Sequence, residues 1–366
     1  MAPVILEVEK HPDILQGIIV STGQHREMLN QVNRIFDIRP DYDLSIMEQS
    51  QTLLRITVKT IQGLEGILLR EKPDMLLVQG DTTTAFAAGL CAFYNKIPVG
   101  HVEAGLRTGD RTRPYPEEIN RRLISVAADQ HYAPTKRSKD NLLKEAVPEP
   151  SIYLTGNTVI DALLKVSQRD FNLKRHGLNL DYNKKIVLVT THRRESFGGP
   201  MKGICSAVGR LAKKYEKEIQ VVLPAHKNPM VRDVVNEMLG NISNVEIIEP
   251  LDYEPFVHLM KASYIILTDS GGVQEEAPSL GKPVLVLREK TERPEAIEAG
   301  TVKLIGVDEE AIFSEAEKLI LDQNEYNKMK RSVNPYGDGK AAIRIIQSIL
   351  YFFGFTDKKA KEFNSL

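Results

Sequence analysis

Short apolar runs rich in β-branched residues recur along this chain, and most are followed by a longer amphipathic stretch. The runs are apolar throughout instead of alternating with polar residues, which is typical of parallel strands covered by helices on both faces. Segment 200–215 has helical spacing, and no Asn-Gly or Asp-Gly turn joins neighbouring runs as a hairpin. The pattern therefore predicts an α/β fold built from right-handed βαβ units. The expected strands are 17–21, 75–79, 97–100, 130–133, 152–155, 186–190, 220–223, 245–248, 264–268, 283–287 and 302–305.

The length and one break in the pattern predict two domains. At roughly 150 residues per domain, 366 residues are expected to form about two. Between 161 and 185 a helix gives way to polar chain before a fresh strand begins. We expect two doubly wound domains, 1–165 and 166–345, with a cleft lined by the carboxyl ends of their strands. Residues 346–366 are expected to form a helix and tail that pack back on the first domain.

Composition excludes several classes of protein. Lys and Arg (48) nearly balance Asp and Glu (49), so the basic excess of a nucleic-acid binder is missing. No apolar run reaches the roughly 18 residues that span a bilayer, and acids follow the apolar start too closely for a signal peptide. Cys91 and Cys205 lie far apart, which favours two reduced thiols over a disulfide. These features predict a cytoplasmic protein that acts on a small molecule.

Three segments of the first expected domain each offer a carboxylate. Asp81 follows strand 75–79, Glu103 follows the next strand, and Glu117 opens a helix after two prolines. Asp81 could instead cap the following helix, and Glu117 could complement a helix dipole. Carboxylates brought together in a dry cleft repel one another, which raises the pKa of at least one and suits acid/base work.

The second expected domain carries features that suit a nucleotide. A basic cluster at 191–195 precedes a helix, which suits a diphosphate site. A run of charges exposed to solvent would give the same pattern. A Ser-Gly-Gly turn at 270–272 would let phosphate approach backbone N–H groups, and a nearby acid could take ribose hydroxyls. Arg293 lies in a loop beyond strand 283–287, where it could also be a plain surface residue.

Seven strings in this order resemble the non-hydrolysing UDP-N-acetylglucosamine 2-epimerases over essentially the whole chain. They are GDTTT, HVEAGLRT, PYPEEINRR, THRRESFG, LPAHKNP, LTDSGGVQEEAPSLGKPVLVLR and TERPEAIEAGT. The resemblance implies two Rossmann-like domains in the glycosyltransferase-B arrangement, with substrate in the central cleft. It also implies interconversion of UDP-N-acetylglucosamine and UDP-N-acetylmannosamine without nicotinamide or metal. Family members are typically cytoplasmic homodimers that supply mannosamine units for bacterial or archaeal surface polysaccharides. Nucleic acid and membrane are not expected partners.

The resemblance also assigns roles to individual residues. The implied catalytic residues are Asp81, Glu103, Glu117 and His192. The implied substrate-binding residues are Phe256, Ser270, Gly271, Gly272, Glu276 and Arg293. In some bacterial members a second UDP-N-acetylglucosamine activates the enzyme, and the matching positions here are Gln24, Glu117, Arg193 and His226. Two further contacts of that allosteric site are Glu27 and Ser50 in this chain, which departs from the usual Gln and Arg.

The start of the chain also departs from the family pattern. Family members open with a strand and a Gly-Thr-Arg-Pro-Glu loop, followed by a Lys, ahead of the helix that begins here at Met1. We expect that the start codon was placed at an internal Met, because a missing central strand would expose a sheet edge. A truly shortened chain would lose cationic contacts worth about 1.5–3 kcal/mol each. It could then be a non-catalytic UDP-sugar-binding protein; a glycosyltransferase of the same fold and a hydrolysing relative are two further hypotheses.

Overall fold

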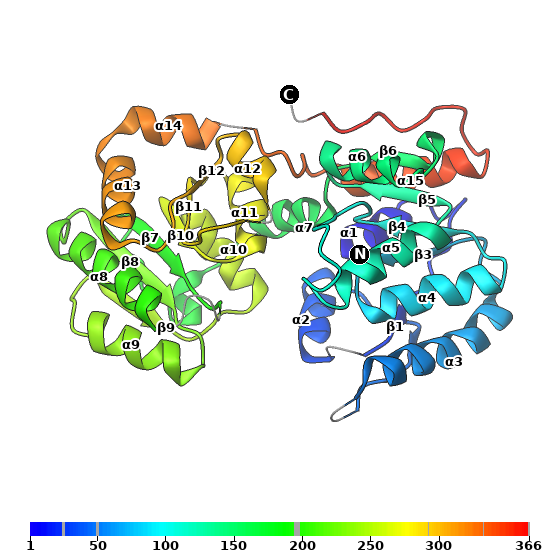
Figure 1. Ribbon diagram of the computed structural model, residues 1–366, viewed down its shortest axis with the longest axis horizontal. Coiled ribbons are helices and arrows are strands. Elements are labelled where there is room, and N and C mark those ends of the chain that lie inside the picture. The colour runs from blue at the N-terminus through cyan, green and yellow to red at the C-terminus, as the bar shows by residue number, and fades with distance from the viewer. Residues whose placement is uncertain (24–25, 49–50, 194–197, 292, 332, 365–366) are drawn as a thin grey trace. The chain divides into compact units, whose positions relative to one another are not determined.

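The computed structural model describes residues 1–23, 26–48, 51–193, 198–291, 293–331 and 333–364 as an α/β protein with parallel sheets (Figure 1). The chain forms two compact units, of which unit 1 combines Met1–Ala162 with Tyr336–Asn364 and unit 2 begins at Leu163 and ends at Pro335. The last helix begins at Ala341 and therefore contains the expected boundary at 345. The domain limits drawn from the sequence stay a prediction.

Unit 1 holds a four-stranded parallel sheet in the order β3-β4-β5-β6 and a separate parallel pair, β1-β2. Its strands are β1 Val20–Ser21, β2 Tyr42–Asp43, β3 Leu76–Gln79, β4 Val99–Val102, β5 Gln130–Ala133 and β6 Ile152–Leu154. Its helices are α1 Ala2–Val8, α2 Arg26–Phe36, α3 Leu53–Glu71, α4 Thr83–Tyr94, α5 Glu117–Ala127, α6 Lys136–Lys144, α7 Thr158–Ser167 (which crosses into unit 2), α15 Ala341–Phe352 and the 3-10 turn η1 Glu149–Ser151. The expected strand at 17–21 is shorter than predicted, and β2 was not predicted.

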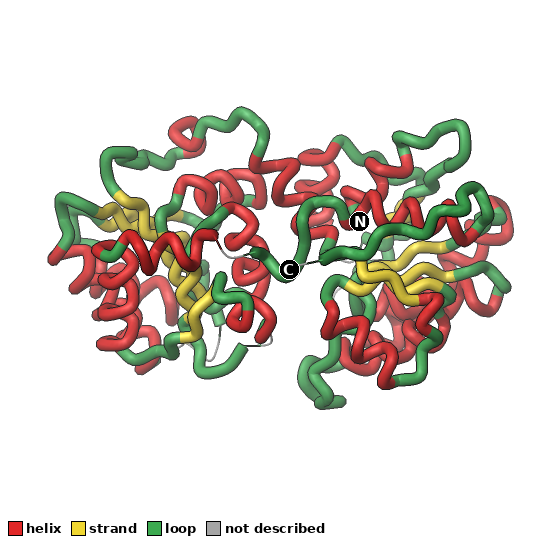
Figure 2. The backbone as a smooth tube through the Cα atoms, turned by 90° about the horizontal axis from the view of Figure 1, so that it is seen from above, coloured by secondary structure: helices red, strands yellow, loops and turns green. Residues whose placement is uncertain are grey.

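Helices cover both faces of the four-stranded sheet, as the tube in Figure 2 shows. On one face α1 and α15 lie side by side, and Ile345 packs with Val4 against Tyr132 of β5. On the other face α3, α4 and α5 bury Leu64 and Cys91 with strand residues from β3 and β4. Strand side chains alternate between these two layers, so apolar residues are needed on both.

The start of α15 is held by a residue from a distant part of the chain. Its own N-cap residue, Lys340, supplies no side-chain hydrogen bond. Buried Asp161 of α7 instead accepts from the backbone N–H of Ala341 (3.2 Å) and of Ala342 (2.9 Å). Burial raises the pKa of Asp161 to about 6, even though these two donors favour the ionised form. Asp161 therefore caps α15 in place of a local side chain.

Unit 2 holds a six-stranded parallel sheet in the order β12-β11-β10-β7-β8-β9. Its strands are β7 Lys185–Thr190, β8 Ile219–Pro224, β9 Val245–Ile248, β10 Ile265–Thr268, β11 Val284–Val286 and β12 Val302–Leu304. Its helices are α8 Gly199–Lys214, α9 Pro229–Leu239, α10 Tyr253–Ala262, α11 Gly271–Glu276, α12 Pro294–Glu298, α13 Glu309–Leu321 and α14 Gln323–Arg331, with 3-10 turns η2 Leu173–His176 and η4 Ala277–Leu280.

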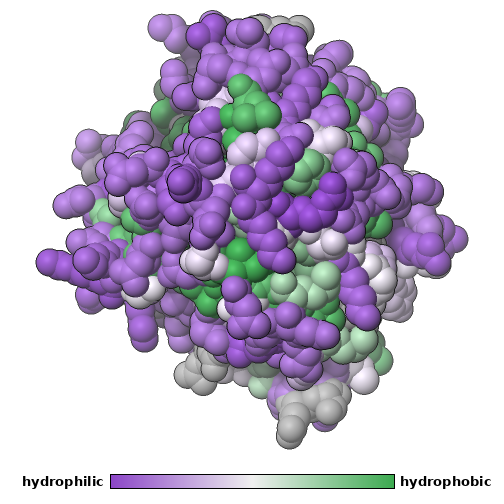
Figure 3. All heavy atoms as spheres, turned by 90° about the vertical axis from the view of Figure 1, so that its left-hand side faces the viewer, coloured by the Kyte–Doolittle hydropathy of each residue, from purple (hydrophilic) through white to green (hydrophobic). Residues whose placement is uncertain are grey.

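One layer of the unit 2 core lies between the sheet and α8, α9 and α13. Val187 and Val189 of β7 pack there against Cys205, and both cysteines of the protein are free thiols. The face of the molecule in Figure 3 is mostly hydrophilic, with hydrophobic residues visible between hydrophilic ones. Over the described ranges, no helix combines the length and hydropathy that crossing a bilayer requires.

Replacing Asp161 by Ala should lower the free energy of unfolding by about 1–3 kcal/mol, because two buried N–H groups lose their acceptor. Urea unfolding followed by circular dichroism measures the change. Asp140→Ala is the matched control, since this half-exposed Asp lies 3.9 Å from Lys136 and its loss should cost less than about 0.5 kcal/mol. Equal effects of the two substitutions would contradict the capping role.

Candidate functional site

The turn after β3 carries Asp81. Gly80 has φ +72°, a left-handed conformation that glycine adopts without strain, and its carbonyl oxygen accepts from Nε2 of buried His101 at 2.8 Å. Burial lowers the pKa of His101 to about 3, so the ring is neutral at physiological pH. The Asp81 carboxylate accepts from Arg121 of α5, with Nε at 2.8 Å and Nη2 at 2.7 Å. His101 thus holds the backbone of the turn at Gly80, and Arg121 holds the Asp81 side chain.

Glu103 emerges from the end of β4, next to the turn that carries Asp81. Residues 79 and 102 are partners in the β3–β4 register, and Gln79 Nε2 donates to Glu103 Oε2 at 3.4 Å. A Cβ placed on Gly80 would lie 3.8 Å from the same carboxylate oxygen. Glu103 itself has φ +66°, which is uncommon for a residue with a side chain and often marks a functional position.

Gly105 explains how the chain turns away after Glu103. Its φ is +88°, and a Cβ at this position would lie 2.2 Å from the carbonyl oxygen of Ser138. No other residue fits so close to the α6 backbone without displacing it. The glycine in the HVEAGLRT string is thus required by packing, and the turn it permits keeps Glu103 beside β3.

Helix α5 brings the third predicted carboxylate into the same region. Glu117 is its first residue and is half-buried. Three residues on, Asn120 Nδ2 donates to the carbonyl oxygen of Asp81 at 2.9 Å, and Arg121 contacts the Asp81 side chain. The segments that carry Asp81, Glu103 and Glu117 therefore meet in unit 1. Repulsion among their carboxylates stays a prediction.

In unit 2 the strand order reverses direction between β7 and β10, which are neighbours in the sheet (Figure 1). Doubly wound sheets bind their ligands at the carboxyl ends of strands that flank such a reversal. Thr190 and Thr268 are the last residues of these strands and are partners in register, with their hydroxyl oxygens 2.6 Å apart. The loops that follow them carry His192 and Ser270.

Asp269 organises the loop that carries His192. Its fully buried carboxylate accepts from the backbone N–H groups of His192 (3.0 Å) and Arg193 (3.0 Å), and the His192 Nδ1 lies 3.1 Å away. Burial alone would raise the pKa of Asp269, but these donors hold it below its usual range. A buried ionised Asp orients the exposed His192 ring. No motif in the sequence assigned a role to Asp269.

The predicted phosphate-binding turn lies next to these residues. Ser270 N donates to Thr268 Oγ1 at 3.0 Å, and Gly271 and Gly272 open helix α11. A Cβ on Gly271 would approach Arg193 Nη2 to 3.8 Å, so the guanidinium lies beside the turn. Arg193 Nε is buried and has no hydrogen-bond partner within the described part of the chain. A cation next to a glycine turn can receive an anionic group.

Two acids lie at the end of α11. Glu275 accepts from Nε of Arg293, which ties the predicted nucleotide-binding arginine to this helix. Glu276 is buried and accepts from the Tyr253 hydroxyl at 3.2 Å. Burial raises the pKa of Glu276 to about 7, and the neighbouring Glu275 charge adds to this. Phe256, also in α10, is half-buried. Neither Glu275 nor Tyr253 was assigned a role from the sequence.

The positions implied for a second, activating ligand are only partly described. Gln24 and Ser50 lie outside the described residues. Arg193 lies beside Gly271, as given above, and His226 is exposed, with Nδ1 accepting from Asn228 N at 3.1 Å. These contacts do not test the allosteric role, which stays a prediction.

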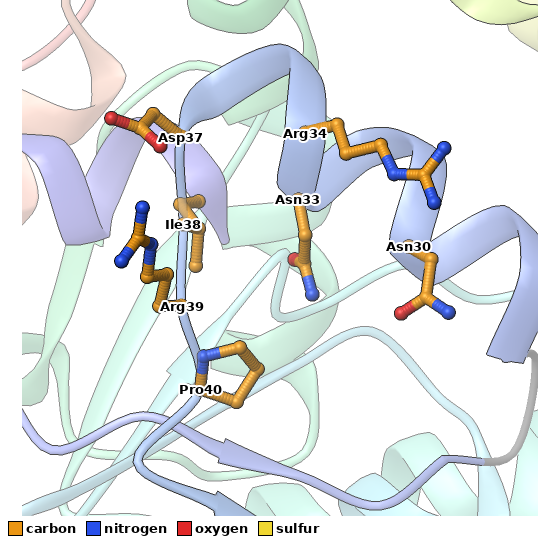
Figure 4. Close-up of a pocket in the computed structure, with 7 residues that line it drawn as sticks. All are labelled: Asn30, Asn33, Arg34, Asp37, Ile38, Arg39 and Pro40. Carbon is orange, nitrogen blue, oxygen red and sulfur yellow. The ribbon is translucent and has the colours of Figure 1, made fainter.

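A hollow of about 500 Å³ lies elsewhere on unit 1, between α2 and the chain that leads to β2 (Figure 4). The guanidinium groups of Arg34 and Arg39 point in different directions there, so they do not converge on one anion. None of the predicted site residues is among its lining residues. Those are Asn30, Asn33, Arg34, Asp37, Ile38, Arg39 and Pro40.

Parallel sheets with polar clusters at the carboxyl ends of adjacent strands define an α/β protein of the Rossmann-like, nucleotide-binding class. The family model described as UDP-N-acetylglucosamine 2-epimerase matches residues 6–350. The chain therefore belongs to the UDP-N-acetylglucosamine 2-epimerase family, whose activity is that of an isomerase. The expected family is confirmed.

Individual relatives agree with this membership. The UDP-N-acetylglucosamine 2-epimerase of Salmonella typhimurium is 53% identical over 95% of this chain and 94% of its own length. A solved structure of a UDP-N-acetylglucosamine 2-epimerase matches with a TM-score of 0.91 at 46% identity, covering 100% of this chain and 95% of the other. The Neisseria meningitidis enzyme, solved with UDP-GlcNAc bound, matches with a TM-score of 0.82 at 49% identity, covering 96% and 95%. The predicted α/β fold of glycosyltransferase-B type is confirmed.

The buried Glu276 predicts a pH-dependent stability. Its folded-state pKa of about 7 exceeds the ordinary value of 4.5, so the folded protein holds this proton more tightly than the unfolded chain. Its stabilising contribution is complete below pH 4.5 and is lost as pH rises through 7. Relative to Glu276→Gln, wild type should lose about 3 kcal/mol over this range. Urea unfolding of both proteins at several pH values measures the difference, and a constant difference would contradict the raised pKa.

Proposed function

We propose that this chain interconverts UDP-N-acetylglucosamine and UDP-N-acetylmannosamine, with Asp81, Glu103 and Glu117 working on the sugar and unit 2 holding UDP. The observation that carries this proposal is the gathering of three acid-bearing segments around the ends of β3 and β4, in a chain of this family. The Neisseria relative solved with UDP-GlcNAc supports the choice of substrate.

The chemistry explains why several carboxylates are needed. The proton on carbon 2 is not adjacent to a carbonyl, so its removal alone is too costly. The proton can transfer to a base while the bond between carbon 1 and the UDP oxygen breaks. The electron pair of that bond departs with UDP, which leaves 2-acetamidoglucal. Return of UDP to carbon 1 and of a proton to the opposite face of carbon 2 gives the epimer. The sequence is redox-neutral, and it needs acid/base groups on both faces of the ring.

The residues of unit 2 suit the departing group. His192, held by Asp269, and Arg193, beside Gly271, are donors that can stabilise the charge developing on the diphosphate. We assign the phosphates to Ser270, Gly271 and Gly272. The remaining nucleotide contacts are assigned to Glu276 for the ribose, Phe256 for the uracil, and Arg293.

The proposal predicts exchange with solvent. In heavy water the protein should place deuterium at carbon 2 of UDP-N-acetylglucosamine while forming a mixture of both UDP-sugars, which proton NMR measures. Glu103→Gln should slow both processes about 10²- to 10⁴-fold, because a general acid or base is lost.

The exposed Glu65 of α3 supplies the control, and Glu65→Gln should exchange at the wild-type rate. Release of free N-acetylmannosamine would instead indicate a hydrolysing enzyme. UDP binding without any exchange would indicate a non-catalytic UDP-sugar-binding protein.

We further infer that the protein acts as a homodimer in the cytoplasm and supplies mannosamine units for surface polysaccharide. The family resemblance supports the cytoplasmic location and the supply of mannosamine units for surface polysaccharide. The dimer is supported by apolar side chains exposed on three helices that pack together, namely Leu54 on α3, Tyr94 on α4 and Val126 on α5, which are 73%, 69% and 86% exposed. Large apolar side chains left exposed on neighbouring helices are the residues that we expect at such an interface.

Val126→Lys should convert the dimer to a monomer, because a charge at an apolar interface loses its hydration. Sedimentation velocity measures the change. Met230→Lys, at an exposed apolar position of α9 in unit 2, is the control that should leave the assembly unchanged. A Val126→Lys protein of unaltered mass would place the interface elsewhere.

A further inference from the structure

Glu118 is a completely buried carboxylate beside the proposed catalytic Glu117. It is the second residue of α5 and has no exposed surface. Its oxygens accept from the backbone N–H groups of Thr108 (3.0 Å) and Gly109 (3.2 Å), and from the Thr108 hydroxyl at 3.2 Å. These donors belong to the loop that leaves Glu103. Glu118 therefore joins the first turn of α5 to that loop.

The same carboxylate also contacts two arginines. Arg121 Nη1 lies 3.4 Å and Arg122 Nη2 lies 3.2 Å from its oxygens. Arg121 turns its Nε and Nη2 to Asp81, so one guanidinium connects Glu118 to a proposed catalytic residue. Burial alone would raise the pKa of Glu118, but the loop amides, the hydroxyl and Arg121 hold it below its usual range. The group is ionised at neutral pH.

An acid in the first turn of a helix complements the helix dipole, but an exposed carboxylate achieves that equally well. Removing a charge from water is costly unless donors from the protein replace the water. Here the donors come from the loop at 108–109 and from the side chains of Arg121 and Arg122, and all of them meet on one side chain. This arrangement holds the loop at 108–109 and the first turn of α5 in a fixed position relative to each other.

We propose that Glu118 is a positioning residue for the epimerase reaction, fixing Glu103, Glu117 and Asp81 relative to one another through the loop, the helix turn and Arg121. This inference rests on the proposed function. Glu118 does not itself touch the sugar, because its carboxylate is enclosed by protein donors. Acid/base catalysis is sensitive to placement, and a shift of about 1 Å in a catalytic group can cost about 100-fold in rate.

The test is Glu118→Gln, which keeps the size of the side chain but turns one acceptor into an NH₂ group facing donors. We expect kcat to fall about 100-fold while KM for UDP-N-acetylglucosamine stays within about threefold. Deuterium exchange at carbon 2 should slow in parallel. The affinity for UDP, measured by calorimetry, should stay within about twofold because the proposed UDP contacts lie in unit 2.

Glu145 offers a matched control. It lies 3.8 Å from the same Arg122 and accepts from Arg107. The loop amides of Thr108 and Gly109 donate to Glu118 and not to Glu145. Glu145→Gln should retain kcat within about threefold. A direct structural readout is amide hydrogen exchange at Thr108 and Gly109, which should accelerate at least tenfold in Glu118→Gln and not in the control.

The outcomes separate this inference from the function on which it rests. Absence of carbon 2 exchange in the wild-type protein would reject the proposed function before any variant is compared. An active wild type with a Glu118→Gln variant that matches the Glu145 control would overturn only the positioning role. Loss of UDP binding and of folded protein in proportion to kcat would equally overturn it, because the residue would then be merely structural.

Discussion

Parallel pairing between neighbouring strands is the interaction on which both polar clusters depend. The β3–β4 register places Gln79 opposite Val102, so the turns that follow carry Asp81 and Glu103 out at the same edge of the sheet. In unit 2 the β7–β10 register places Thr190 opposite Thr268, which brings the His192 and Ser270 loops together. Because a one-residue shift would turn every side chain to the other face, where its packing partners differ, close packing on both faces stabilises these registers.

The protonation state of each buried carboxylate depends on the hydrogen-bond donors around it. Asp269 and Glu118 each accept from backbone N–H groups and have basic side chains nearby, and they stay ionised as organisers of loops. Glu276 accepts from the Tyr253 hydroxyl, and burial raises its pKa to about 7. Asp161 accepts from the N–H groups of Ala341 and Ala342, and burial still raises its pKa to about 6. The number and charge of donors, weighed against burial, thus decide the protonation state.

Much of the fold followed from periodicity. The strands predicted at 130–133 and 245–248 have the observed bounds, and the others that were expected in unit 2 are within a few residues. Short β2, with two residues, gives no readable pattern. Asp81, Glu103 and the Ser-Gly-Gly turn were found because each follows a strand, and Glu117 because it opens a helix after two prolines. Asp269, Arg121 and Glu118 were not assigned, since their partners lie far along the chain or in loops whose shape no local pattern specifies.

The sequence by itself determined the family, the alternation of strands and helices, and which residue types carry the proposed chemistry, since these depend on local composition and on ordered motifs. Only the tertiary structure decided which acids are held by which donors. The residues next to Arg121 in the sequence would equally allow it to face solvent. Those next to Asp269 would equally allow it to cap a helix. Hydrogen bonds between distant segments depend on where the sheet places those segments, and buried polar groups need such partners.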